Sequence, residues 1–172
     1  LLPLGLALLL SACQFDLNPP DSAICDLRPL QAQETRIDDQ QGLFSYCGDS
    51  TQVSLQNQGR TLVGQLRMAD QNRDLRETAL TFRYEINSRI PLQAGTLPLG
   101  EGVTVEAQLQ LDYEDLFIGP SFTIENIVLK DFAPENELLS LEFTLHYTTT
   151  PLTGGTDTAH ELFIQAQALQ IN

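Results

Sequence analysis

The stretch LTFRYEI, residues 80–86, decides the fold class, because apolar and polar side chains alternate at every position along it. Successive side chains of a β-strand point to opposite faces, so this period of two predicts a strand with one apolar and one polar face. The same alternation recurs in VTVEAQLQL, residues 103–111, and in LSLEFTLHY, residues 139–147. Weaker forms of it predict further strands at residues 51–56, 60–69, 121–130 and 160–171.

The alternation slips at two places. The apolar parity changes between Ile124 and Ile127, and again between Ala168 and Leu169. An extra residue in one strand of a pair shifts the parity in this way, so each slip predicts a β-bulge. After Cys13 no segment carries a convincing helical stripe.

Strands with one apolar face must bury that face against other strands. We therefore expect an all-β protein, an antiparallel β-sandwich of about seven to eight strands. The alternative is a small closed β-barrel, similar to the lipocalins, which hold an apolar ligand inside. The sequence alone leaves both architectures open.

The N-terminal run LLPLGLALLLSAC, residues 1–13, is apolar and ends in Leu10-Ser11-Ala12-Cys13. It is shorter than the roughly 20 residues that span a bilayer, and its length suits the apolar region of a secretory signal. It resembles a bacterial lipoprotein signal with its lipobox. The resemblance implies removal of residues 1–12 and acylation of the Cys13 thiol; the alternative is an ordinary secretory signal cleaved near Ala12. The usual initiator Met and basic residues are missing, so we expect the signal to begin upstream of Leu1.

The resemblance also implies a location. Gln14 follows Cys13, where an Asp would resemble the signal for retention in an inner membrane. We expect a lipid-anchored protein of the cell envelope, at the outer membrane and facing the periplasm or the cell surface. Residues 13–40 contain Asn18-Pro19-Pro20 and many polar side chains, which predicts a lipidated tether. Residues 41–172 are expected to form a single β domain.

The chain has three cysteines. A lipid on Cys13 leaves Cys25 and Cys47 in a compartment where disulfides persist, so we predict that these two pair. Such a bond would pin the second half of the tether to the domain. Two free buried thiols are the alternative.

The formal net charge of −14 argues against nucleic acid and against adsorption to anionic lipid, so the lipid anchor must hold the protein to the membrane. Residues 91–172 carry twelve acidic side chains and the single cation Lys130. This half either meets a basic partner or divalent cations, or is a solvated face adapted to a salty exterior.

Two polar motifs and the two histidines are the candidate sites of chemistry. DQNRD at residues 70–74 resembles the first half of a calcium loop, but Leu75 stands where that loop needs Gly and Thr81 where it needs Glu, so we interpret the motif as a polar hairpin turn. DYED at residues 112–115 is expected to be a solvated strand end. His146 and His160, the only histidines, are expected to be exposed strand residues. We therefore predict no catalytic residue, no metal site and no cofactor.

The apolar segment Leu116-Phe117-Ile118 lies between the acidic DYED turn and a predicted strand. Exposed, it would form a small binding loop; packed inward, it would close one end of the fold. The sequence thus predicts a non-enzymatic envelope protein whose β domain binds a protein partner or stabilises an assembly. The alternatives are a carrier of an apolar small molecule or lipid and, third, an enzyme acting on glycans.

Overall fold

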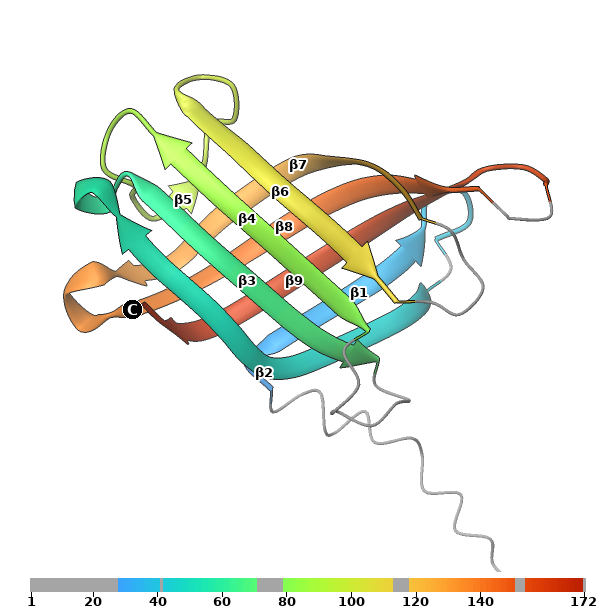
Figure 1. The fold of residues 1–172 in the computed structure, drawn as a ribbon, viewed down its shortest axis with the longest axis horizontal. Coiled ribbons are helices and arrows are strands. Elements are labelled where there is room, and N and C mark those ends of the chain that lie inside the picture. The colour runs from blue at the N-terminus through green and yellow to red at the C-terminus, as the bar shows by residue number, and fades with distance from the viewer. Residues whose placement is uncertain (1–27, 41, 71–78, 113–117, 151–153, 172) are drawn as a thin grey trace, which may run out of the picture.

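The computed structural model of the 172-residue chain describes residues 28–40, 42–70, 79–112, 118–150 and 154–171. These residues form nine antiparallel strands in one sheet, with the order β5-β7-β8-β9-β1-β2-β3-β4-β6 (Figure 1). The strands are β1 (Leu30–Arg36), β2 (Gly42–Gln56), β3 (Thr61–Asp70), β4 (Leu80–Ser88), β5 (Gly95–Thr96), β6 (Val103–Leu111), β7 (Ile118–Ala133), β8 (Leu138–Thr149) and β9 (Thr158–Gln170). Two single 3-10 turns, η1 (Asn57–Gly59) and η2 (Pro134–Asn136), join β2 to β3 and β7 to β8.

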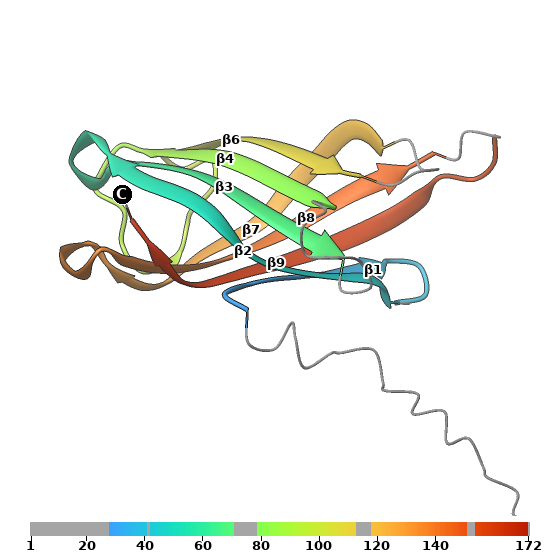
Figure 2. The same ribbon diagram turned by 60° about the horizontal axis from the view of Figure 1, so that its bottom comes forward.

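The prediction of an all-β antiparallel protein is confirmed. The sheet curls into a half-barrel whose two halves face each other, so that β3, β4 and β6 lie over β7, β8 and β9 (Figure 2). A sandwich consists of two sheet layers that face each other, whereas a barrel consists of one continuous sheet. The fold thus has features of both predicted architectures.

The strand predicted most clearly, β4, buries its apolar face as expected. Phe82 and Tyr84 of β4 meet Phe143 of β8 across the interior, with ring centroids 4.8 and 4.9 Å apart. Tyr84 also lies over Gly64 of β3, where a Cβ atom would stand 2.2 Å from the tyrosine ring, so only glycine fits there. Burial of Tyr84 raises the pKa of its phenol above the ordinary value. Aromatic rings therefore fill the space between the two halves.

Both predicted bulges are present. The register of β7 against β8 shifts between Ile124 and Asn126. The register of β8 against β9 shifts opposite Ala168, which has a positive φ of 49° and donates its N–H to Ser140 Oγ over 3.0 Å. A bulge bends its strand, so both irregularities contribute to the curl of the sheet.

One predicted boundary needs correction. Residues 30–36, assigned from the sequence to the tether, form β1, which pairs with β2 on one side and β9 on the other. The β domain therefore begins before residue 41. The strand was missed because its inward positions include the charged Glu34, which interrupts the apolar alternation after Leu30 and Ala32. The structure also adds the two-residue strand β5.

Among the described residues, no helix is long and apolar enough to cross a membrane.

Candidate functional site

The curled sheet does not close on itself. β6 ends the sheet on one side, and β7 ends it on the other except where β5 pairs with Val128 and Leu129. Among the described residues, no strand is hydrogen-bonded to the side of β6 that faces away from β4. We call the region between β6 and the Phe122–Ile124 segment of β7 the seam.

The hydrogen bonds at the two ends of β6 show which backbone groups face the seam. Arg89 N–H donates to Gly102 O over 3.1 Å, and Asp112 N–H donates to Ala79 O over 2.8 Å. Hydrogen-bonded pairs alternate along an antiparallel ladder, so the even-numbered residues of β6 bond to β4. The N–H and C=O groups of the odd-numbered residues therefore point into the seam; these residues are Val105, Ala107 and Leu109.

The seam contains a cleft of about 630 Å³. Its walls include half-buried apolar side chains from both strands: Val105, Ala107, Phe122 and Ile124. At one end the segment that carries β5 bridges the edges, since Leu97 N–H donates to Ile127 O of β7 over 3.0 Å and Gly100 N–H donates to Val103 O of β6 over 3.0 Å. The cleft thus combines an unpaired strand edge with an apolar floor, which is the surface that an added β-strand needs.

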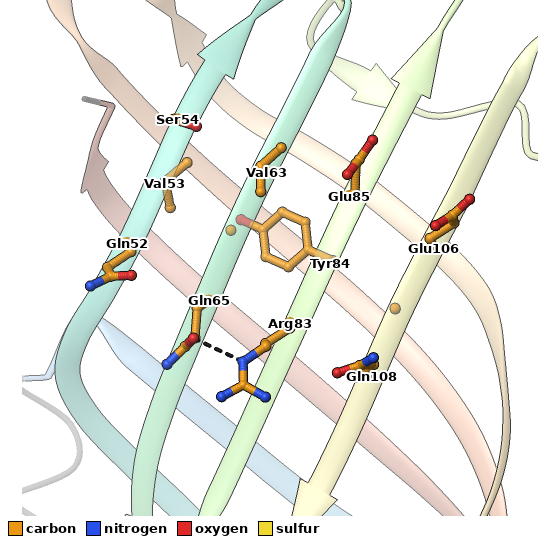
Figure 3. Close-up of a pocket in the computed structure, with 12 residues that line it drawn as sticks. Gln52, Val53, Ser54, Val63, Gln65, Arg83, Tyr84, Glu85, Glu106 and Gln108 are labelled. Atoms are coloured by element: carbon orange, nitrogen blue, oxygen red, sulfur yellow. Dashed lines mark hydrogen bonds between the residues drawn. The ribbon is translucent and has the colours of Figure 1, made fainter.

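The outer lips of the seam are acidic. Glu106 of β6 and Glu125 of β7 both lie exposed on the outer face. Glu106 also stands directly opposite Glu85 of β4, and Figure 3 shows the two carboxylates as neighbours. Like charges directly opposite each other across a ladder are destabilising, so a cation placed here would relieve the repulsion.

The outer face beside β6 holds a hollow of about 760 Å³ over β2, β3, β4 and β6. Four side chains cross it in one register row: Gln52, Gln65, Arg83 and Gln108. Arg83 Nε donates to Gln65 Oε1 over 2.9 Å, the dashed line in Figure 3. The Arg83 guanidinium thus adds a cationic position one row away from Glu85 and Glu106, within an otherwise amide-rich surface.

His160 corrects a prediction, because it is buried rather than exposed. Its side chain is 5% exposed, and its Nδ1 lies 3.1 Å from Oε1 of Glu34, which is 3% exposed. On the other side of the ring, Nε2 lies 2.7 Å from Thr149 Oγ1. The ring stacks on Tyr147 with centroids 4.8 Å apart. The sequence alone did not predict the burial of His160, because its partner Glu34 lies in β1, within the predicted tether.

This buried cluster is a polar network in which His160 Nδ1 lies at ion-pair distance from Glu34 without the geometry of a hydrogen bond. Tyr46 Oη donates to Glu34 Oε2 over 2.9 Å, so the carboxylate has a partner on each oxygen. The order carboxylate, imidazole, hydroxyl also occurs in acyl-transfer sites. Thr149, however, is 6% exposed, which leaves its hydroxyl little access to a substrate. We assign the cluster a structural role at the centre of the sheet.

His146 lies as predicted on the polar face of β8, where its side chain is 35% exposed. Its Nε2 is close to two carboxylates, Glu125 and Glu161. Asp112 is exposed at the end of β6, and the rest of the DYED motif lies outside the described residues. Asp70 of the DQNRD motif is buried at the end of β3, and residues 71–74 also lie outside them.

The remaining predicted site residues are only partly described. Ile118 begins β7 and stands opposite Thr149, while Leu116 and Phe117 lie outside the described residues. Cys47 takes part in a disulfide. Cys13 and Cys25 lie outside the described residues, so lipidation and the Cys25–Cys47 pairing stay predictions. The seam was not predicted, because nothing in the sequence of residues 103–111 marks them as an edge strand.

Comparison of the chain with protein-family models, with curated proteins and with solved structures found no match in any of the three.

Proposed function

We propose that this protein is a lipid-anchored, non-enzymatic protein of the bacterial cell envelope, and that its β domain binds a partner protein by adding a strand to β6. The observation that carries the proposal is that one side of β6 pairs with no strand among the described residues and lies beside an apolar cleft. A row of unpaired backbone groups is a template for another chain, and strand addition satisfies such groups directly.

The packing of the interior favours a binding module over a carrier of apolar molecules. A carrier needs an apolar cavity inside the barrel. Here Phe82, Tyr84 and Phe143 occupy the space between the halves of the sheet, with their centroids less than 5 Å apart at two contacts, 4.8 and 4.9 Å. The seam, in contrast, is open at the surface.

The chemistry of the seam defines the partner. Side chains of an added strand alternate between the cleft and the outer face. Those that enter the cleft would meet Val105, Ala107 and Phe122 and should be apolar. Those that point outward would lie between Glu106 and Glu125 and should be basic. We infer an extended segment in which apolar residues alternate with Lys or Arg.

Binding of synthetic peptides tests strand addition. We expect KVKVKVKVK to bind, measured by fluorescence anisotropy, and to bind more weakly as salt is added, because salt screens the charges at the lips. The peptide EVEVEVEVE and the rearranged peptide KKKKKVVVV should bind at least about tenfold more weakly, since they lack the basic charge and the alternation respectively.

A matched pair of variants separates strand addition from general charge attraction. Ala107→Pro removes an N–H that faces the seam while the bonds of its neighbours to β4 remain, and proline is tolerated on edge strands. It should weaken KVKVKVKVK binding at least about tenfold, the free energy of one or two net hydrogen bonds. Ala107→Ser keeps the N–H and should bind like the unchanged protein. Equal binding by the proline variant and the serine variant contradicts strand addition.

The anchor has its own test. Mass spectrometry of the protein, expressed from its complete reading frame in its own host, should give a mature chain that begins at Cys13 and carries a lipid mass. Cys13→Ser should leave the chain unlipidated and move it out of the membrane fraction. An unmodified Cys13 in a membrane-bound chain refutes the lipid anchor and leaves strand addition untouched.

A further inference from the structure

Three neighbouring strands bring one histidine and two glutamates together on the outer face of the sheet. His146 of β8 stands directly opposite Glu161 of β9. Glu125 of β7 is the residue that the predicted and observed bulge leaves unpaired between Ile124 and Asn126. Their side chains are 35%, 45% and 59% exposed, respectively, so solvent reaches all three.

The two carboxylates converge on one atom of the imidazole. His146 Nε2 lies 3.2 Å from Glu161 Oε2 and 3.3 Å from Glu125 Oε2. Ligand atoms at about 2.0–2.2 Å from a tetrahedral zinc ion lie about 3.3 Å from one another. The distances from His146 Nε2 to the two carboxylate oxygens therefore already match two edges of a zinc coordination tetrahedron. The three ligand atoms all lie within 4.8 Å of one another, so the remaining carboxylate–carboxylate edge closes with a small rotation of exposed side chains.

The local charge also favours a cation. Two carboxylates face a single imidazole. In the described residues, the ion-pair partner of both Glu125 and Glu161 is His146. The cation Lys130 of the same half pairs instead with Glu142. A divalent ion at the centre of the cluster would neutralise both carboxylates and coordinate neutral His146.

We propose that Glu125, His146 and Glu161 form a binding site for a divalent transition metal of the zinc type. One imidazole nitrogen and two carboxylate oxygens make three protein ligands, which leaves a fourth position open to water or to a donor from another molecule. Imidazole selects zinc-type ions over calcium and magnesium, which prefer oxygen alone. Because β-strands hold all three residues, the site is built into the sheet. This inference does not depend on strand addition at β6.

The sequence predicts no metal site here, because Glu125, His146 and Glu161 come from segments far apart in the chain and no short spacing links them. The acidity of residues 91–172 is compatible with divalent cations, but no sequence pattern predicts the strand pairing that brings Glu125 and Glu161 to the same histidine.

Titration calorimetry with zinc chloride on the untagged, full-length protein tests the site. We expect one saturable site, and we expect His146→Gln to weaken zinc binding at least about 30-fold, since it removes the nitrogen ligand. Glu161→Gln should weaken binding about tenfold. Glu135→Gln is the matched control, because it removes an exposed carboxylate from η2, at the opposite end of β8 from His146, and it should change the affinity less than about twofold. Circular dichroism checks that each variant stays folded.

A spectroscopic readout distinguishes coordination from adsorption on an acidic surface. Copper(II) bound to the protein should show nitrogen hyperfine splitting from one imidazole in its electron paramagnetic resonance spectrum. His146→Gln should abolish that splitting, although His160 remains in the chain. The proposal is overturned if zinc shows no saturable binding, if His146→Gln binds zinc as well as the unchanged protein, or if Glu135→Gln weakens binding as much as Glu161→Gln.

Discussion

Strands β6 and β8 have the same alternation in sequence and opposite situations in the fold. Every inward apolar side chain of β8 is buried, from Leu139 to Tyr147, and β8 pairs with β7 on one side and β9 on the other. The inward side chains of β6 between Val103 and Leu111 are only half-buried, and β4 is the only strand in the described part of the chain that pairs with β6. β8 therefore contributes mainly to stability, whereas β6 has backbone groups left over for binding.

The difference shows that apolar–polar alternation predicts which face of a strand is buried. It does not predict how many neighbouring strands that strand pairs with. A central strand and an edge strand need the same local pattern when both cover one core. Variants of the two strands should therefore separate stability from binding.

The largest effect is expected in β8. Phe143→Ala removes a fully buried ring that contacts Phe82 and Tyr84, and it should lower the free energy of unfolding by about 3–5 kcal/mol. Urea denaturation followed by circular dichroism measures the loss. Phe143→Leu, which keeps most of the apolar volume, should cost clearly less. A loss below about 1 kcal/mol for the alanine variant would mean that the interior is not packed as described.

A similar but smaller effect is expected from the buried network beside β8. Glu34→Ala leaves the Tyr46 hydroxyl and the His160 imidazole without the carboxylate they share, and should cost about 3 kcal/mol. Glu34→Gln retains an acceptor for Tyr46 and should cost less. If Glu34→Ala were as stable as the unchanged protein, β1 would not be a central strand of this sheet. Thermal unfolding of the three proteins gives the answer.

Leucines at matched inward positions compare the two strands directly. Leu109 of β6 is half-buried, so Leu109→Ala should cost only about 1 kcal/mol. Leu145 of β8 is 0% exposed, so Leu145→Ala should cost about 2–5 kcal/mol. Urea midpoints measured in parallel test the difference. Equal losses from the two variants would mean that β6 is as enclosed as β8 and that the seam is shut.

The smallest effect belongs to the outer face of β8. The hydrogen bond from Lys130 holds the pKa of the Glu142 carboxyl below its ordinary value. A carboxyl whose pKa is lower in the folded state stabilises the protein above its unfolded pKa, and the contribution disappears as the pH falls through the folded pKa. Lys130 is half-exposed, so Glu142→Gln should cost at most about 1 kcal/mol at neutral pH. Chemical denaturation over a pH series should show the two proteins converging in acid; a constant gap would assign the effect to packing.

The sequence predicted the strands whose periodicity is complete, and it predicted both bulges from slips of parity at Ile124 and Ala168. It could not predict β1, because an inward Glu34 looks polar until its partner His160 is known. It placed His160 on the exposed face for the same reason, since burial of a polar side chain depends on residues from other strands. The seam and the Glu125–His146–Glu161 cluster arise from strand order, which local patterns do not encode.

The most direct test of strand addition is amide hydrogen exchange in β6, followed residue by residue by nuclear magnetic resonance. Without a partner, the amides of Val105, Ala107 and Leu109 should exchange quickly, and those of Glu106, Gln108 and Gln110, which bond to β4, should exchange slowly. Addition of KVKVKVKVK should protect the first set and leave the second unchanged. Uniform protection along β6 before any peptide is added, or no change after it, would contradict the claim that β6 is an edge available to a partner.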